Sequence, residues 1–284
     1  MKKPGWFKVR YIDNEESRQV KDLLEKNSLH TVCQSAHCPN KQECWAHGTA
    51  SFMIMGEFCT RGCRFCAVKT LARPPPLDPE EPEKLAEAVS SLNLKYIVIT
   101  SVDRDDLEDY GASHFAACVR ALKEKSRGTK IETLIPDFNG ERPALEKLAS
   151  AKPDVISHNV ETVERLSPQI RDRRADYKKS LQVLGMVKDI DKDIITKSGL
   201  MVGFGETTDE VEQTMKDLRN AGVEIITMGQ YLSPSSAHYP VKEFVSPETF
   251  DDYKKTAYSL GFRYVASGPL VRSSYRAEEA FLLN

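Results

Sequence analysis

The sequence predicts an α/β fold: an incomplete (β/α)6-type TIM barrel with an N-terminal cysteine-bearing extension and a C-terminal tail. Six short apolar runs alternate with amphipathic segments, which is the pattern of parallel strands buried by helices on both faces. The chain has 284 residues, enough for one large core. Polar clusters follow the predicted strands, and α/β folds carry their function at the carboxyl ends of strands.

The N-terminal part predicts one helix before the first strand. Residues 15–27 form this helix because their apolar side chains share one face. The stretch from 29 to 48 is polar, cysteine-bearing and irregular. Residues 50–58, "ASFMIMGEF", predict a buried first strand, and the proline-rich residues 73–82 predict a loop.

The remaining elements alternate along the chain. Further strands are expected at residues 95–101, 130–136, 154–160, 198–204 and 223–232. Helices are expected at residues 79–92, 111–126, 141–150, 175–189 and 208–220. From Phe262 onward, the tail predicts a short strand and a final helix. This alternation is typical of βαβ units around a parallel sheet.

Composition and charge narrow the class of protein. The formal net charge is -2, so nucleic-acid binding is not implied. No stretch approaches the ~20 apolar residues of a membrane span, and the N-terminus lacks the apolar core of a secretory signal. We therefore expect a cytoplasmic protein that binds neither membranes nor nucleic acid. In that compartment, clustered cysteines are metal ligands or redox groups more often than disulfides.

Six of the seven cysteines form two triplets between Cys33 and Cys66. The downstream triplet, Cys59, Cys63 and Cys66, is spaced C-x3-C-x2-C and directly follows the first predicted strand. Three thiolates can hold three irons of a 4Fe–4S cluster, whose usual complement is four cysteines. The remaining iron would then stay open to a small molecule.

The upstream triplet, spaced C-x4-C-x5-C, allows an alternative interpretation as part of a zinc site. Zinc takes four ligands, and cysteine and histidine supply most of them in structural sites. Candidate zinc ligands are Cys33, Cys38, Cys44 and His47, with His37 close by. On this alternative the chain would be a zinc-stabilised binding module. The barrel pattern weighs against it, because a zinc knuckle does not need a barrel.

The downstream triplet resembles the signature of radical S-adenosylmethionine (SAM) enzymes, in which Phe65 before the last cysteine is also typical. Together with the upstream triplet and "RSSY" at 272–275, it resembles the lipoyl synthase family. Further stretches resemble the same family: "TSVDRDDL" (100–107), "ETLIPDF" (132–138), "HNVET" (158–162), "MVGFGET" (201–207) and "GQYLSPS" (229–235). The rival is another sulfur-inserting or methylthiolating radical enzyme, which the upstream triplet and "RSSY" disfavour.

The resemblance implies a radical SAM sulfurtransferase. Lipoyl synthases insert two sulfur atoms, at C6 and C8, into an octanoyl chain that is carried on a lysine of a lipoyl carrier protein. The carrier would be a dehydrogenase E2 subunit or the glycine-cleavage H protein. A reduced ferredoxin- or flavodoxin-type protein would supply the electrons.

The resemblance also implies two 4Fe–4S clusters and SAM as cosubstrate. The ligands of the radical SAM cluster would be Cys59, Cys63 and Cys66. The ligands of an auxiliary cluster, which donates its own sulfur, would be Cys33, Cys38, Cys44 and Ser274. The alternative for Ser274 is the N-cap of a final helix, because serine is a good cap.

We expect three parts in the chain on this reading. Residues 1–49 would be an extension that carries the auxiliary cluster's cysteines, and residues 50–261 would be the radical SAM partial barrel. Residues 262–284 would be a tail that closes over the auxiliary cluster.

SAM binding would need side chains near the downstream triplet. The candidates at strand ends and in the cysteine loop are Phe65, Ser101, Asp103, Asn159 and Glu161. Helix capping is the alternative for such polar clusters: residues 103–106 would suit a first helical turn, and Thr207 with Glu210 fits a capping box.

Two further features have simple interpretations. Cys118 falls on the apolar face of a helix and is expected to be a buried, inert thiol. Residues 169–179, "QIRDRRADYKK", are basic and could dock an acidic carrier domain, or could form a solvated helix face.

Overall fold

The computed structural model describes residues 3–7, 14–26, 29–35, 38, 40–46, 51–92, 94 and 96–282. His37 and His47 of the zinc alternative, and the expected boundary between residues 49 and 50, lie outside these ranges. Within them, an eight-stranded sheet forms the centre of the fold. No helix among the described residues is both long and apolar enough to cross a bilayer.

The strands of this sheet neighbour one another in the order β1-β2-β5-β6-β7-β8-β9-β10. Their bounds are β1 (His30–Thr31), β2 (Ser51–Ile54), β5 (Tyr96–Ser101), β6 (Lys130–Leu134), β7 (Val155–Ser157), β8 (Ile195–Val202), β9 (Ile225–Gln230) and β10 (Tyr264–Gly268). All pairs from β2 onward are parallel, and β1 is antiparallel to β2. A separate small pair joins β3 (Phe58–Cys59) to β4 (Lys69–Thr70).

The prediction of an incomplete barrel is confirmed. The described edge strands, β1 and β10, do not pair with each other, so the sheet stays open. β10 is the strand expected in the tail, and it pairs with β9 in register Tyr264 to Ile225. The tail therefore adds a seventh parallel strand to the six that the apolar runs predicted.

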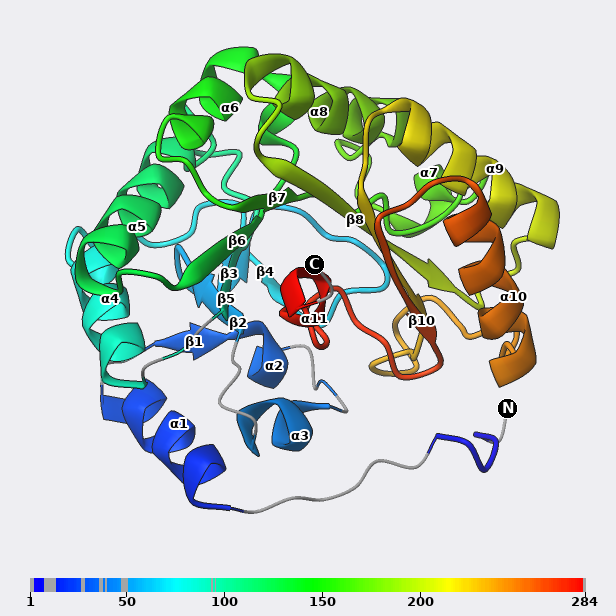
Figure 1. Ribbon diagram of the computed structural model, residues 1–284, viewed down its shortest axis with the longest axis horizontal. Helices are drawn as coiled ribbons and strands as arrows, with labels where there is room; N and C mark the ends of the chain where they lie inside the picture. Colours follow the sequence, from blue (N-terminus) through cyan, green and yellow to red (C-terminus); the bar gives the residue numbers. More distant parts are fainter. Residues whose placement is uncertain are drawn as a thin grey trace.

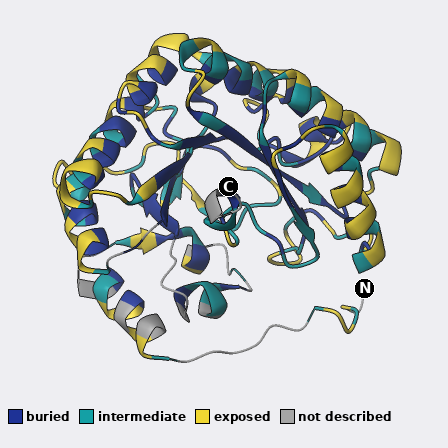
Figure 2. Cartoon of the chain, in the orientation of Figure 1, coloured by how far each residue is buried: buried dark blue, intermediate teal, exposed yellow. Residues whose placement is uncertain are grey.

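The longer helices of the barrel cover the outside of the sheet (Figure 1). They are α4 (Glu81–Leu92), α5 (Ala112–Lys125), α6 (Arg142–Ala149), α8 (Tyr177–Ile190), α9 (Thr208–Asn220) and α10 (Pro247–Ser259). Figure 2 shows exposed outward faces on these helices and buried strands inside them. The core lies between the two layers, and it includes Cys118, which is 0% exposed on α5 as predicted.

The remaining helices lie around the ends of the barrel. They are α1 (Glu15–Lys26), α2 (Val32–Ser35), α3 (Lys41–Ala46), α7 (Ser167–Ile170), α11 (Glu279–Leu282) and the 3-10 helix η1 (Phe138–Gly140). The cysteine-bearing segment expected to be irregular thus contains two short helices, α2 and α3.

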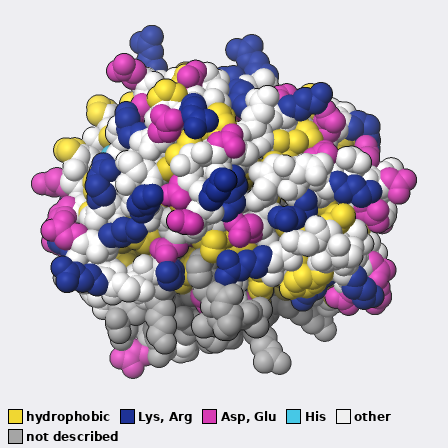
Figure 3. Space-filling model, turned by 45° about the horizontal axis from the view of Figure 1, so that its top comes forward, with side chains coloured by type: hydrophobic (Ala, Val, Ile, Leu, Met, Phe, Trp, Pro, Cys, Tyr) yellow, Lys and Arg dark blue, Asp and Glu magenta, His cyan; other side chains and the backbone are white. Residues whose placement is uncertain are grey.

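On the face shown in Figure 3, Lys and Arg side chains are interspersed with Asp and Glu.

The end of the C-terminal tail, with α11, lies inside the ring of strands (Figure 1). Ala277 packs with Tyr96 and Val98 of β5 on one side of the ring. Ala280 packs with Ile225 of β9 and Tyr264 of β10 on the other. Because the tail crosses the interior in this way, residues 272–275 reach the cavity described next.

Candidate active site

A single cavity of about 570 Å³ collects the side chains that the sequence marked as functional. It lies at the carboxyl ends of the parallel strands, where this fold class binds ligands. All of the predicted site residues line it: Cys33, Cys38, Cys44, Cys59, Cys63, Cys66, Phe65, Ser101, Asp103, Asn159, Glu161 and Ser274. Much of the remaining wall is apolar, with Met53, Val102, Leu134, Ile135 and Met201.

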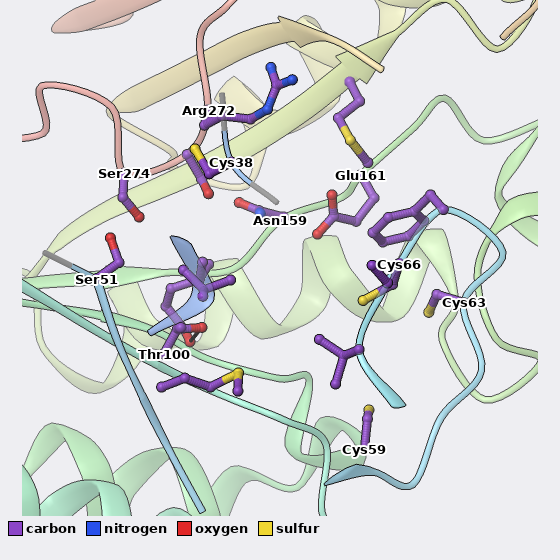
Figure 4. Close-up of a pocket in the computed structure, with 18 of the residues that line it drawn as sticks. Cys38, Ser51, Cys59, Cys63, Cys66, Thr100, Asn159, Glu161, Arg272 and Ser274 are labelled. Atoms are coloured by element: carbon purple, nitrogen blue, oxygen red, sulfur yellow. Dashed lines mark hydrogen bonds between the residues drawn. The ribbon is translucent and has the colours of Figure 1, made fainter. Parts of the chain in front are cut away.

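The two cysteine triplets lie at different ends of this cavity. Figure 4 shows Cys59, Cys63 and Cys66 together at one end, and Cys38 with Ser274 at the other. All of the cysteines are free thiols. Among the described residues, no three His, Cys, Asp or Glu side chains are grouped so that they could hold one metal ion.

The downstream triplet already receives hydrogen bonds from the backbone. The Sγ of Cys59 accepts from the N–H of Asp103 at 3.3 Å, and the Sγ of Cys63 accepts from the N–H of Asp172 at 3.2 Å. Burial raises the pKa of both thiols to about 12. Such thiols ionise only when a metal binds them, and the N–H groups suit sulfur that carries negative charge.

Arg61, inside the C-x3-C-x2-C loop, ties that loop to the sheet. Its guanidinium donates to Asp105 at 2.7 Å and to Asp137 at 2.7 Å, and lies 3.3 Å from Asp103. The side chain is only 4% exposed. Asp103 and Asp105 follow β5 and Asp137 follows β6, so one buried cation fixes the loop against two strand ends.

Sequence reasoning missed Arg61 and Asp137. Arg61 lies between two cysteines of the downstream triplet, and Asp137 lies in one of the stretches that resemble the family, so the sequence offered both as candidates. It did not indicate that they bond to each other, because 76 residues separate them.

The capping interpretation of residues 103–106 is wrong. Helix α5 begins at Ala112, well after these aspartates, so they cannot occupy its first turn. Burial raises the pKa of Asp103 to about 6, although the positive charge of Arg61 opposes the shift. The capping box at Thr207 is confirmed: Thr207 Oγ1 accepts from the N–H of Glu210 at 3.3 Å, and Glu210 accepts from the N–H of Thr207 at 2.8 Å.

The remaining SAM candidates include polar atoms that have no partner within the described chain. Ser101 Oγ and Asn159 Oδ1 are both buried without a hydrogen bond there. A buried unpaired polar atom is costly, and a polar ligand would relieve that cost. These orphan atoms therefore fit a polar cosubstrate in the cavity.

Glu161 lies between the two ends of the cavity in Figure 4. Its φ of 67° is left-handed, a conformation that costs about 1–2 kcal/mol for a residue with a Cβ. Bonds to β8 hold it there: its N–H donates to Gly199 O at 3.1 Å, and its carbonyl accepts from Met201 at 2.9 Å. Burial raises the pKa of the Glu161 carboxyl.

Phe65 lines the cavity and packs against the part of the core to which β8, β9, α9 and α10 contribute.

The upstream triplet is carried by the short helices of the extension. Cys33 lies on α2 and Cys44 on α3, with Cys38 between them. Burial raises the pKa of Cys33 to about 11, and the neighbouring Cys38 adds to the shift. Burial also raises the pKa of Cys38 and of Cys44. Burial therefore favours the neutral thiols, and a bound metal would favour the thiolates.

The extension and the tail are joined by a clasp of hydrogen bonds. Asn40 Nδ2 donates to Leu270 O at 2.6 Å, and the Tyr275 hydroxyl donates to Glu43 at 3.0 Å. Arg276 reaches the same Glu43 oxygen at 3.2 Å. The clasp brings Ser274 to the end of the cavity that the upstream triplet lines.

The capping alternative for Ser274 is wrong. Helix α11 begins at Glu279, and the residues from 273 to 278 form turns. Ser274 therefore precedes no helix that its hydroxyl could cap.

Comparison with known proteins gives a consistent answer over the whole chain. Residues 53–218 match the Radical SAM superfamily. The chain is 56% identical over 278 residues to the lipoyl synthase of Caldicellulosiruptor bescii, covering 98% of this chain and 95% of that protein. It is also 56% identical over 281 residues to the lipoyl synthase of Myxococcus xanthus, covering 99% and 94%.

Distant solved structures share the fold. The FeFe-hydrogenase maturase HydG from Carboxydothermus hydrogenoformans superposes with a TM-score of 0.55 at 12% identity, covering 95% of this chain and 77% of that one. Methylornithine synthase superposes with a TM-score of 0.53 at 12% identity, covering 90% and 79%.

Proposed function

Because the chain belongs to the lipoyl synthase family of radical SAM enzymes, we propose that it inserts sulfur at C6 and C8 of an octanoyl chain. The octanoyl chain is held in amide linkage on a lysine of a carrier protein, and the product is a lipoyl group. One observation carries this proposal: both cysteine triplets and Ser274 line one largely apolar cavity. A saturated acyl chain fits such walls, and its C–H bonds are too weakly acidic for a base to open.

The proposal assigns two 4Fe–4S clusters to this cavity. Cys59, Cys63 and Cys66 hold the cluster that serves SAM. The auxiliary cluster is held by Cys33, Cys38, Cys44 and Ser274. When bound, the first cluster would supply one electron for each SAM molecule that is cleaved, and the auxiliary cluster would supply the sulfur that enters the product.

The chain's own residues hold and orient these groups. The N–H groups of Asp103 and Asp172 donate to cysteine sulfurs, and Arg61 fixes the loop between them. Ser101, Asn159, Glu161 and Asp103 offer polar atoms to SAM, with Phe65 in the adjoining wall.

The threefold division of the chain is part of the proposal. Residues 1–49 supply three auxiliary ligands, residues 50–261 supply the radical SAM site, and residues 262–284 supply Ser274. The clasp through Glu43 supports this division, because it joins the first part to the third directly.

The partners follow from the same assignment. The carrier is a dehydrogenase E2 subunit or a glycine-cleavage H protein, and a reduced ferredoxin- or flavodoxin-type protein supplies electrons. Residues 169–179 offer this carrier few free cations. Arg171 is buried against Ser180 at 3.0 Å, Arg174 pairs with Asp172 at 2.9 Å, and Lys178 pairs with Glu164 at 3.4 Å. This pairing favours the alternative of a solvated helix face over a docking role.

An anaerobic assay tests the proposal. Protein reconstituted with iron and sulfide should hold about eight irons, as expected for two 4Fe–4S clusters. With SAM, a reductant and an octanoyl-lysine peptide, it should form lipoyl-lysine peptide, detected by mass spectrometry.

Two triple variants separate the clusters. Replacing Cys59, Cys63 and Cys66 with Ala should leave about four irons and stop 5′-deoxyadenosine formation. Replacing Cys33, Cys38 and Cys44 should spare 5′-deoxyadenosine and abolish the thiolated product. Zinc in place of iron, or lipoyl product from the second variant, would contradict the assignment.

A further inference from the structure

Arg272, the first residue of "RSSY", is a cation that lines the cavity and makes few polar contacts. Its Nη1 donates to the carbonyl of its own neighbour, Val271, at 2.6 Å. Among the described residues, no carboxylate lies within ion-pair distance of its guanidinium. A guanidinium carries several N–H donors, and only this one contact uses any of them among the described residues.

The other arginines that line the cavity are satisfied. Arg61 has three aspartates around it, the nearest at 2.7 Å. Arg171 donates to Ser180 Oγ at 3.0 Å and to Asp176 O at 3.4 Å. Arg272 differs from both in its contacts, because its only hydrogen bond among the described residues goes to the backbone carbonyl of its neighbour.

The tail at Val271 and Arg272 packs closely against strand β9. A Cβ built on Gly229, at the end of β9, would lie 2.1 Å from Val271 O and 3.4 Å from Arg272 Nη1. Only glycine lets the tail lie this close to the strand. Figure 4 shows Arg272 beside Cys38, at the end of the cavity that also holds Ser274.

Arg272 is half-buried, and a charge that is partly removed from water is unfavourable unless it is paired. An anion in the cavity would supply the missing partner.

We propose that Arg272 is a positioning residue that provides the counter-charge for the anionic iron–sulfur cluster at Cys33, Cys38 and Cys44. The inference rests on the proposed function, which places a cluster there. Reduction adds negative charge to a cluster, so a fixed cation beside it favours the reduced form and raises its reduction potential. The same attraction slows loss of iron from a cluster that has one hydroxyl ligand in place of a thiolate.

The experiment uses the full chain with Cys59, Cys63 and Cys66 replaced by Ala, so that any remaining cluster is the auxiliary one. Into this parent we would introduce Arg272→Gln, which removes the charge, and Arg272→Lys, which keeps it as a point charge. Lys255→Gln, on the outer helix α10, is the control for loss of one positive charge. Iron content, cluster reduction potential and the rate of iron release to a chelator are measured for each.

The counter-charge role predicts a more negative potential and a several-fold faster iron release for Arg272→Gln. Arg272→Lys should stay near the parent, and Lys255→Gln should match it. An unchanged potential in Arg272→Gln with iron retained would overturn the inference and leave the proposed function intact.

Other outcomes are equally decisive. If Arg272→Gln folds but holds no iron, Arg272→Lys with normal iron and potential supports the role. Loss of iron from both variants overturns it, because charge is then not what the site needs. Weaker SAM binding by Arg272→Gln in the unmodified chain, with an unchanged auxiliary potential, would assign the guanidinium to SAM instead. A parent without about four irons would refute the two-cluster assignment itself.

Discussion

Replacing Arg61 with Gln should strongly destabilise the protein even before any cluster binds. The side chain of Asp137 is 0% exposed, and Arg61 is its closest cation at 2.7 Å. Removing one partner of a buried ion pair costs about 3–5 kcal/mol, because the other charge stays buried. Lys179 lies 3.9 Å from Asp137 and would offset part of this penalty, so we expect a loss of about 3 kcal/mol.

Urea unfolding of the reduced, metal-free protein, followed by circular dichroism, measures this loss. Arg165→Gln is the matched control, because Arg165 also grips a carboxylate, Glu210, but with 51% and 26% of the two side chains exposed. Such a surface pair is worth about 0–1 kcal/mol. Adding Asp137→Asn to Arg61→Gln should recover part of the stability, since it removes the unpaired charge. A cost for Arg61→Gln no larger than the control's, or no recovery in the double variant, would refute the reasoning.

Ser274→Ala should still cleave SAM and lose most lipoyl product, whereas Ser274→Cys should hold iron yet release less sulfur, because thiolate binds iron more firmly than a hydroxyl oxygen. Wild-type amounts of lipoyl peptide from both variants would remove Ser274 from the mechanism. His158 should make stability fall with acid, because burial lowers its pKa in the folded protein to about 4, below the ordinary value. Its contribution is full above about pH 6.5 and is lost as the pH falls from there toward 4, by about 3 kcal/mol in all. His158→Asn should flatten the unfolding free energy over that window, and an unchanged slope would count against a neutral buried imidazole.

Elements with strong local signals were predictable from the sequence. Helix α9 spans Thr208–Asn220, the range expected, because Thr207 and Glu210 form a capping box at its start. Strand β5 was expected at residues 95–101 and covers Tyr96–Ser101 of the described residues, nearly all of them buried, as an apolar run bounded by polar loops predicts. In each case the deciding signal, a capping box or an apolar run, lies within a few residues along the chain.

Helix α10 was missed although its signals are also local. Ser246 Oγ accepts a hydrogen bond from the N–H of Thr249, and Phe250, Tyr253 and Ala257 are buried on one face. The short helices α2 and α3 are a different matter. Isolated helices of this length are unstable, so only their packing against the barrel forms them.

The sequence by itself determined the ligand types, their spacing and the alternation of strands and helices. Spacing within a loop decides how many thiolates can share a cluster, and apolar periodicity decides which faces are buried, so neither needs distant contacts. Only the tertiary structure decided which residues meet, such as Arg61 with Asp137 and Glu43 with Tyr275. It also decided that Arg272 has no carboxylate partner among the described residues. These contacts join segments up to 233 residues apart, and their energies depend on burial that only the folded barrel provides.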